Sequence, residues 1–212
     1  MGLVGFDPEL VATSINNVQN AYNDLIRAIA TDMQSQFVNG MQDKWACNDA
    51  QTFFQTFKEV VDTLIKDSNN TFQSVVEAMN SAANNWAQGT GGSWAAKSFN
   101  RLDKQMDVSC IQENIGGVRG VDPEATSVSN RLTSISGAAV SALTDAQSAV
   151  QNCGFIGGSS ASSLISALGK IKSNIETAVN QISSDCQKAI ETTANTYTNL
   201  DVKISDAFSG TN

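Results

Sequence analysis

The 212-residue chain carries the same apolar pattern twice, and this repeat constrains the fold more than any other feature. Phe6-Asp7-Pro8-Glu9 opens one long segment, and Val121-Asp122-Pro123-Glu124 opens a second. A repeat of this length predicts two similar helical hairpins in one chain, equivalent to a dimer encoded as a monomer. In the later part of each segment, an offset of 111 residues superposes the apolar positions, namely Phe53 on Leu164, Phe57 on Leu168, Val60 on Ile171, Leu64 on Ile175, Val75 on Cys186, Met79 on Ile190 and Trp86 on Tyr197.

Apolar residues recur in steps of three and four, which is typical of a helix with one buried stripe. The pattern predicts helices over residues 8–40 and from about residue 49 to residue 87, and a matching pair in the second repeat. Each proline follows an Asp, the arrangement of an Asp N-cap with Pro at the first helical position. We expect an all-α fold in which two long hairpins pack antiparallel as a four-helix bundle, with strands nearly absent. The domains are a first hairpin (1–87), a linker (88–120) and a second hairpin (121–212).

The long linker favours antiparallel packing of the hairpins. A helix of about 33 residues is roughly 50 Å long, and the chain must travel back along the bundle before the second hairpin begins. Trp94, Leu102 and Met106 are spaced by eight and four residues, which predicts a short amphipathic helix in the linker.

Composition excludes several classes of function. A net charge of −8 argues against nucleic acid as a partner, and no apolar run approaches the roughly 20 residues that span a bilayer. The N-terminal residues lack the features of a cleaved signal peptide. Histidine is absent, so Ser–His and Cys–His nucleophiles are excluded, and we expect neither an enzyme nor a cofactor.

The four cysteines are Cys47, Cys110, Cys153 and Cys186. Their spacing matches no CxxC pair, so a zinc site is not expected. Four cysteines allow three complete pairings, and the sequence does not choose among them. Antiparallel hairpins would place Cys47 and Cys153 at opposite ends, where they cannot pair.

Two local features are candidates for a site. Trp45-Ala46-Cys47 lies in the first hairpin turn, and Phe155-Ile156-Gly157 is its counterpart in the second. An aromatic side chain there can fold over the hairpin end, although a local hydrophobic staple explains it equally well. Near the end of the last helix, Tyr197 and Asp201 are four residues apart, so both side chains lie on one helical face.

With these motifs the chain resembles the WXG-motif proteins of type VII secretion systems in Gram-positive bacteria and mycobacteria. Members of that family are helical hairpins that pair as antiparallel dimers, and many pairs carry a Tyr-x-x-x-Asp/Glu export signal. The resemblance covers both repeats. It implies that Trp45 matches the family Trp and that Tyr197 and Asp201 match the export signal, while Cys47 replaces the motif Gly and Phe155 replaces the second Trp.

The resemblance implies a non-enzymatic substrate or export partner of type VII secretion. Trp45, Tyr197 and Asp201 would form one composite signal, and a membrane-bound secretion ATPase would read it. A co-exported toxin or effector is a further expected partner, and the chain would be a monomer. It would be cytoplasmic before export and then secreted or on the cell surface. The alternative is a structural helical scaffold or filament subunit, which the richness in Ser, Thr, Asn and Ala also suits.

Overall fold

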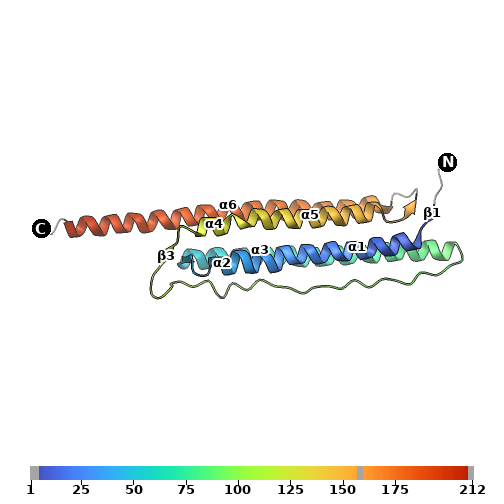
Figure 1. Ribbon diagram of the computed structural model, residues 1–212, viewed down its shortest axis with the longest axis horizontal. Helices are drawn as coiled ribbons and strands as arrows, with labels where there is room; N and C mark the ends of the chain where they lie inside the picture. Colours follow the sequence, from blue (N-terminus) through green and yellow to red (C-terminus); the bar gives the residue numbers. More distant parts are fainter. Residues whose placement is uncertain (1–4, 157–159, 210–212) are drawn as a thin grey trace.

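The computed structural model describes residues 5–156 and 160–209, which form an elongated, mostly helical molecule (Figure 1). The prediction of an all-α chain is therefore confirmed at this level. The helical segments, in chain order, are α1 (Pro8–Ile26), the π-helical η1 (Arg27–Val38), α2 (Asn39–Met41), α3 (Asn48–Gly89), α4 (Ala125–Ser129), α5 (Arg131–Gln151) and α6 (Ser160–Ser209).

Two short antiparallel strand pairs tie the two halves of the chain together. The strands are β1 (Gly5–Phe6), which pairs with β4 (Phe155–Ile156), and β2 (Trp45–Ala46), which pairs with β3 (Gly120–Val121). The two pairs lie at opposite ends of the region where the helices lie side by side, and α6 continues beyond the β2–β3 pair (Figure 1). In each pair, the strand that precedes a first helix joins the turn of the other half. The sequence did not predict these strands, because two residues are too few for an alternating pattern.

Backbone hydrogen bonds continue both strand pairs in the same way. The Asp7 N–H donates to the Gly154 carbonyl over 3.1 Å, and the Asp122 N–H donates to the Lys44 carbonyl over 2.6 Å. Each Asp also binds the backbone that follows it: Asp7 Oδ1 accepts from the N–H groups of Glu9 and Leu10, and Asp122 Oδ1 accepts from that of Glu124. Asp7 is therefore the N-cap of α1 with Pro8 at the first helical position, as the sequence predicted. The same prediction is wrong for Asp122, because Pro123 and Glu124 form a turn and α4 begins only at Ala125, with Glu124 as its N-cap.

Each long helical segment contacts two others. The α1–η1 segment contacts α3 and α5, and α6 contacts α5 and α3. The core runs the length of these contacts, and most of the superposed repeat positions are equivalent in burial. Both members are buried in the pairs Phe57 and Leu168, Val75 and Cys186, and Met79 and Ile190. In one pair the burial differs, because Val60 is partly exposed and Ile171 is buried.

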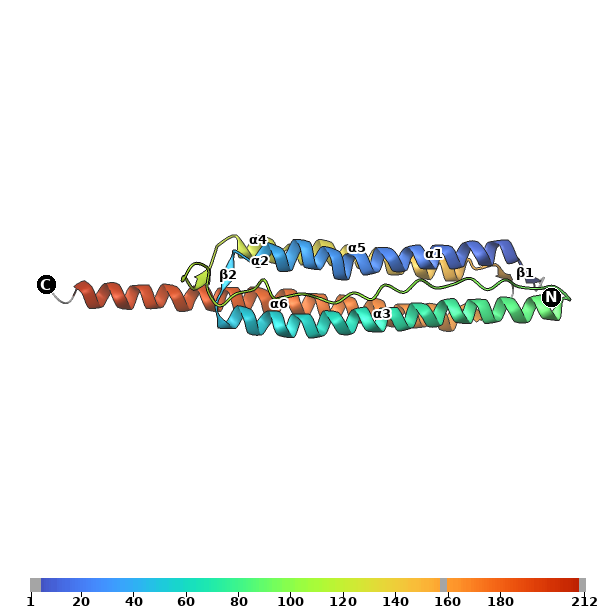
Figure 2. The same ribbon diagram turned by 90° about the horizontal axis from the view of Figure 1, so that it is seen from below.

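The linker contradicts one prediction, because it contains no helix between residues 92 and 119. Residues 94–111, here called the strap, run extended along the molecule between α1 and α3 (Figure 2). Trp94 and Leu102 are partly buried against the core and Met106 is buried within it. The apolar spacing correctly marked Trp94, Leu102 and Met106 as side chains that pack on the core. The strap needs no helix of its own, because side chains of the neighbouring helices bind its backbone groups.

Among residues 5–156 and 160–209, no helix combines the length and the hydropathy that a membrane-spanning segment requires.

Candidate functional site

Side chains of α1, η1 and α3 hold the strap by its backbone. Polar side chains donate to its carbonyls and accept from its N–H groups at five positions, so the contacts do not depend on the strap's own side chains. The partners are Asn80 with Lys97, Gln19 with Asn100, Tyr22 and Asn69 with Leu102, Lys58 and Asp62 with Met106, and Gln34 with Asp107. We call these contacts the backbone ladder.

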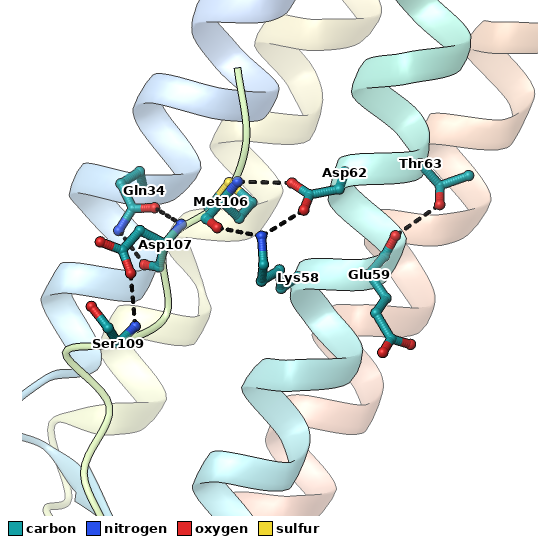
Figure 3. Close-up of polar contacts among 8 residues, drawn as sticks. All are labelled: Gln34, Lys58, Glu59, Asp62, Thr63, Met106, Asp107 and Ser109. Carbon is teal, nitrogen blue, oxygen red and sulfur yellow. Dashed lines mark hydrogen bonds and ion pairs between the residues drawn. The ribbon is translucent and has the colours of Figure 1, made fainter. Parts of the chain in front are cut away.

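At Met106 the side chains that bind the strap's backbone are charged (Figure 3). Lys58 Nζ donates to Asp62 Oδ2 and to the Met106 carbonyl, each over 2.6 Å. Asp62 Oδ1 accepts from the Met106 N–H over 2.8 Å. Hydrogen bonds to charged groups are stronger than neutral ones, so this ion pair fixes both backbone groups of Met106.

Gln34 continues the ladder from the opposite side of the strap. Its amide accepts from the Asp107 N–H over 2.9 Å and donates to the Asp107 carbonyl over 2.8 Å. The Asp107 side chain turns the other way and binds Ser109, whose hydrogen bonds lower the pKa of that carboxyl group. At Met106 and Asp107 the strap is therefore bound by both α3 and η1.

The ladder's innermost member is Tyr22, whose side chain is fully buried. Its hydroxyl accepts from the Leu102 N–H over 2.6 Å and donates to Asn69 Oδ1 over 2.7 Å. Burial raises the pKa of Tyr22, so the hydroxyl stays protonated and available as a donor. None of these groups is arranged as a nucleophile with a base, and within the described residues no cluster of three or more metal-ligating side chains occurs.

Trp45 lies at the end of the molecule where β2 pairs with β3, and its side chain is fully buried. Its ring packs against Phe53 and Phe54, with centroids 5.6 and 6.2 Å apart. The indole N–H has no hydrogen-bond partner among the described residues. Trp45 therefore folds over the end of the first half and stabilises the turn from inside, and its ring is not available at the surface.

Cys47, the last residue of Trp45-Ala46-Cys47, is the N-cap residue of α3. Its φ of −171° and ψ of 173° are extended backbone that any residue adopts. A glycine is therefore not required at this position, and the turn forms with a cysteine.

The opposite end is built around Phe155, which is partly buried and stacks on Phe6 with centroids 5.9 Å apart. Phe6 also meets the ring of Trp94, the first residue of the strap. Gly154 has a φ of +76°, and a Cβ there would lie 3.0 Å from the Asp7 carbonyl oxygen. Glycine is thus required here, one residue before the aromatic. Gly157, the predicted turn glycine, lies outside the described residues.

The C-terminal part of α6 projects beyond the other helices (Figures 1 and 2). Tyr197 and Asp201 belong to the last 13 residues of α6, and no residue from 194 to 204 is buried. Tyr197 is partly exposed and Asp201 is exposed. The projection leaves the molecule at the end that holds β2 and β3. The Trp45 turn and the Tyr197–Asp201 pair are therefore toward the same end of the molecule. The Trp45 ring is buried in the core, whereas the pair lies on the surface of α6.

All four cysteines are free thiols in the structure. Cys47 and Cys153 lie beside the strand pairs at opposite ends, so they are too far apart to pair (Figure 1). Burial raises the pKa of Cys110 and Cys153, and it raises the pKa of Cys186 to about 12. A thiol with a raised pKa is a poor nucleophile at neutral pH.

The sequence reading missed the backbone ladder, although a signal for it exists in the repeat. Under the offset of 111, several buried apolar positions of α3 correspond to polar positions of α6: Val61 to Lys172, Ile65 to Glu176, Phe72 to Ser183 and Val76 to Gln187. The apolar face of α3 is therefore wider than that of α6, which indicates that a further segment of the chain covers part of α3. That cover includes the strap.

The chain matches no protein-family model, no curated protein and no solved structure. The case for its function therefore depends on the residues and contacts described above.

Proposed function

We propose that this chain is a type VII secretion substrate or export partner, built as a single-chain version of an antiparallel WXG-like dimer. In this proposal each half is a helical hairpin, and the two hairpins form a four-helix bundle. The reciprocal strand pairs support it, because each half completes the turn of the other. The neighbour relations of α1, α3, α5 and α6 are those that such a bundle requires.

The observation that carries the export proposal is the projecting end of α6. Tyr197 and Asp201 lie one helical turn apart on that end, and Asp201 is exposed. A membrane-bound secretion ATPase could contact both side chains without disturbing the core. Trp45 would contribute through the shape of the turn, since its ring is buried. A co-exported toxin or effector remains a proposed partner.

The test is export from the native host, measured as the secreted fraction of each variant. We expect Tyr197→Ala and Asp201→Ala to lower export while the helical circular dichroism stays unchanged, because both side chains lie outside the core. Thr198→Ala is the matched control, since Thr198 is exposed and adjacent to Tyr197. Export of all three variants at the parent level would refute the signal assignment.

A second candidate, a structural scaffold or filament subunit, is favoured by a different feature of the same end. Leu200, Val202 and Ile204 are large apolar residues exposed on the projecting part of α6, and exposed apolar surface promotes association. Light scattering separates the candidates. A scaffold should form oligomers at micromolar concentration, whereas a fused pseudo-dimer should remain a monomer.

A further inference from the structure

A groove of about 880 Å³ lies between α3 and α6, lined by residues 52–67 of α3 and 174–185 of α6. Its apolar surface comes from Phe53, Phe57, Val60 and Leu64 of α3 and from Ala178 and Ile182 of α6. Phe53, Val60 and Ala178 are partly exposed. A hollow of this size and polarity is typical of a binding site.

Threonine hydroxyls along the groove are already bonded to their own helix. Thr52, Thr56 and Thr63 each donate to the carbonyl four residues earlier, over 3.0, 3.3 and 2.8 Å; the Thr63 bond is visible in Figure 3. Their donor hydrogens are therefore not free for a ligand, and these residues add methyl groups to the lining. The groove is more apolar than its composition indicates.

The strap shows what this molecule uses to hold an extended segment, namely side chains that pair with backbone N–H and C=O groups. The α3–α6 groove has few such groups. Of its two amide side chains, Gln181 is bonded to Asp185. An extended occupant would leave backbone groups unpaired, at a cost of about 1–3 kcal/mol each. The groove therefore suits an occupant that satisfies its own backbone, which is a helix.

The charged residues that line the groove predict which side chains the docked helix carries on its flanks. Glu59, Asp67 and Asp185 line the groove, and no Lys or Arg is among the lining residues that the structure describes. The Glu59 and Asp67 side chains make no ion pair or hydrogen bond within the described part of the chain. Three carboxylates without a cation attract basic side chains.

We propose that the α3–α6 groove docks an amphipathic helix of a partner protein, with an apolar stripe on the groove floor and Lys or Arg on both flanks. The lining residues of α3 run from Thr52 to Asp67, a length of about 22 Å at 1.5 Å per residue. A helix of about 16 residues covers it. The groove does not include Trp45, Tyr197 or Asp201, so binding to it is tested separately from export.

The test measures binding of a fluorescein-labelled amphipathic 18-residue peptide, with Leu on one face and Lys on the flanks, to the full chain by anisotropy. We expect saturable 1:1 binding. Glu59→Lys with Asp67→Lys should weaken it at least about tenfold at low salt. The matched control, Glu77→Lys with Glu191→Lys, reverses two exposed acids outside the groove and should change the affinity less than about twofold.

Two further arms make the result decisive. Thr56→Trp fills the groove from an exposed position and should abolish binding while circular dichroism stays unchanged. A peptide with Glu in place of Lys should not bind. Equal weakening by both double variants would overturn the proposal. So would a dimer of the parent chain that Thr56→Trp dissociates, since the groove would then belong to a second copy.

Discussion

Removing one hydroxyl group, in Tyr22→Phe, tests whether the backbone ladder stabilises this molecule. The Tyr22 ring packs against Phe72 and Phe99, with centroids 5.4 and 4.7 Å apart, and Phe keeps those contacts. The variant loses the two short hydrogen bonds to Leu102 and Asn69. It leaves a backbone N–H and a buried amide oxygen without their partner.

The magnitude follows from those two unpaired groups. A buried polar group left without a partner costs about 1–3 kcal/mol. Asn69 is 2% exposed, while the Leu102 backbone lies nearer the surface, so we expect a loss of about 2–4 kcal/mol in the free energy of unfolding. For a chain of this size, that corresponds to a Tm lower by roughly 5–15 °C.

The assay is urea and thermal unfolding followed by circular dichroism at 222 nm. The chain offers its own control, because its other tyrosine, Tyr197, is partly exposed on the projecting helix. Tyr197→Phe removes the same hydroxyl and should change stability by less than about 0.5 kcal/mol. Trypsin gives a local readout, since Lys97 and Arg101 lie in the strap and should be cleaved faster in Tyr22→Phe. Equal stability and equal cleavage in the two variants would refute the role of the ladder.

Two further predictions concern stability. Burial raises the pKa of the Cys186 thiol from 9.0 to about 12, so the unfolded chain loses the thiol proton at a lower pH than the folded chain does. The thiol's contribution is full below about pH 9 and is lost from there to about pH 12, at about 1.4 kcal/mol per pH unit. Cys186→Val, which copies Val75 of the first repeat, should flatten the dependence of the urea midpoint on pH above 9, and parallel curves would contradict this. Gly154→Ala should cost about 2 kcal/mol or more, because of its positive φ and the contact with the Asp7 carbonyl. Gly137→Ala, at an open position inside α5, should instead stabilise by about 0.5–1 kcal/mol, and similar losses in both glycine variants would refute this.

Much of the fold could be predicted from sequence because it depends on local patterns. Stripes such as Val11, Ile15 and Val18 mark the buried faces of helices, and Asp7 with Pro8 marks where α1 begins. The strap could not be predicted in this way, since its backbone partners are distant in sequence. Leu102 binds Tyr22 across 80 residues, and no local pattern records such a contact.

The same distinction, between local sequence patterns and contacts made by distant residues, applies to the candidate site. The sequence singled out Trp45, Tyr197 and Asp201 by type and spacing, but burial decides what each can do. Trp45 is enclosed by Phe53 and Phe54, and that enclosure depends on how the turn folds onto α3. The 12-residue π-helix η1 had no sequence signal either, although it carries Gln34 of the ladder.

The central claim is that the two halves of the chain complete one another as the subunits of a dimer do. Splitting the chain tests it most directly. Gly116 and Gly117 form an exposed turn with φ of +59° and +88°, so a cut between them disturbs no helix. Fragments 1–116 and 117–212, produced separately and mixed, should form a 1:1 complex with the helicity of the intact chain, measured by sedimentation and circular dichroism. Fragments that stay apart, or that each pair only with themselves, would contradict the account.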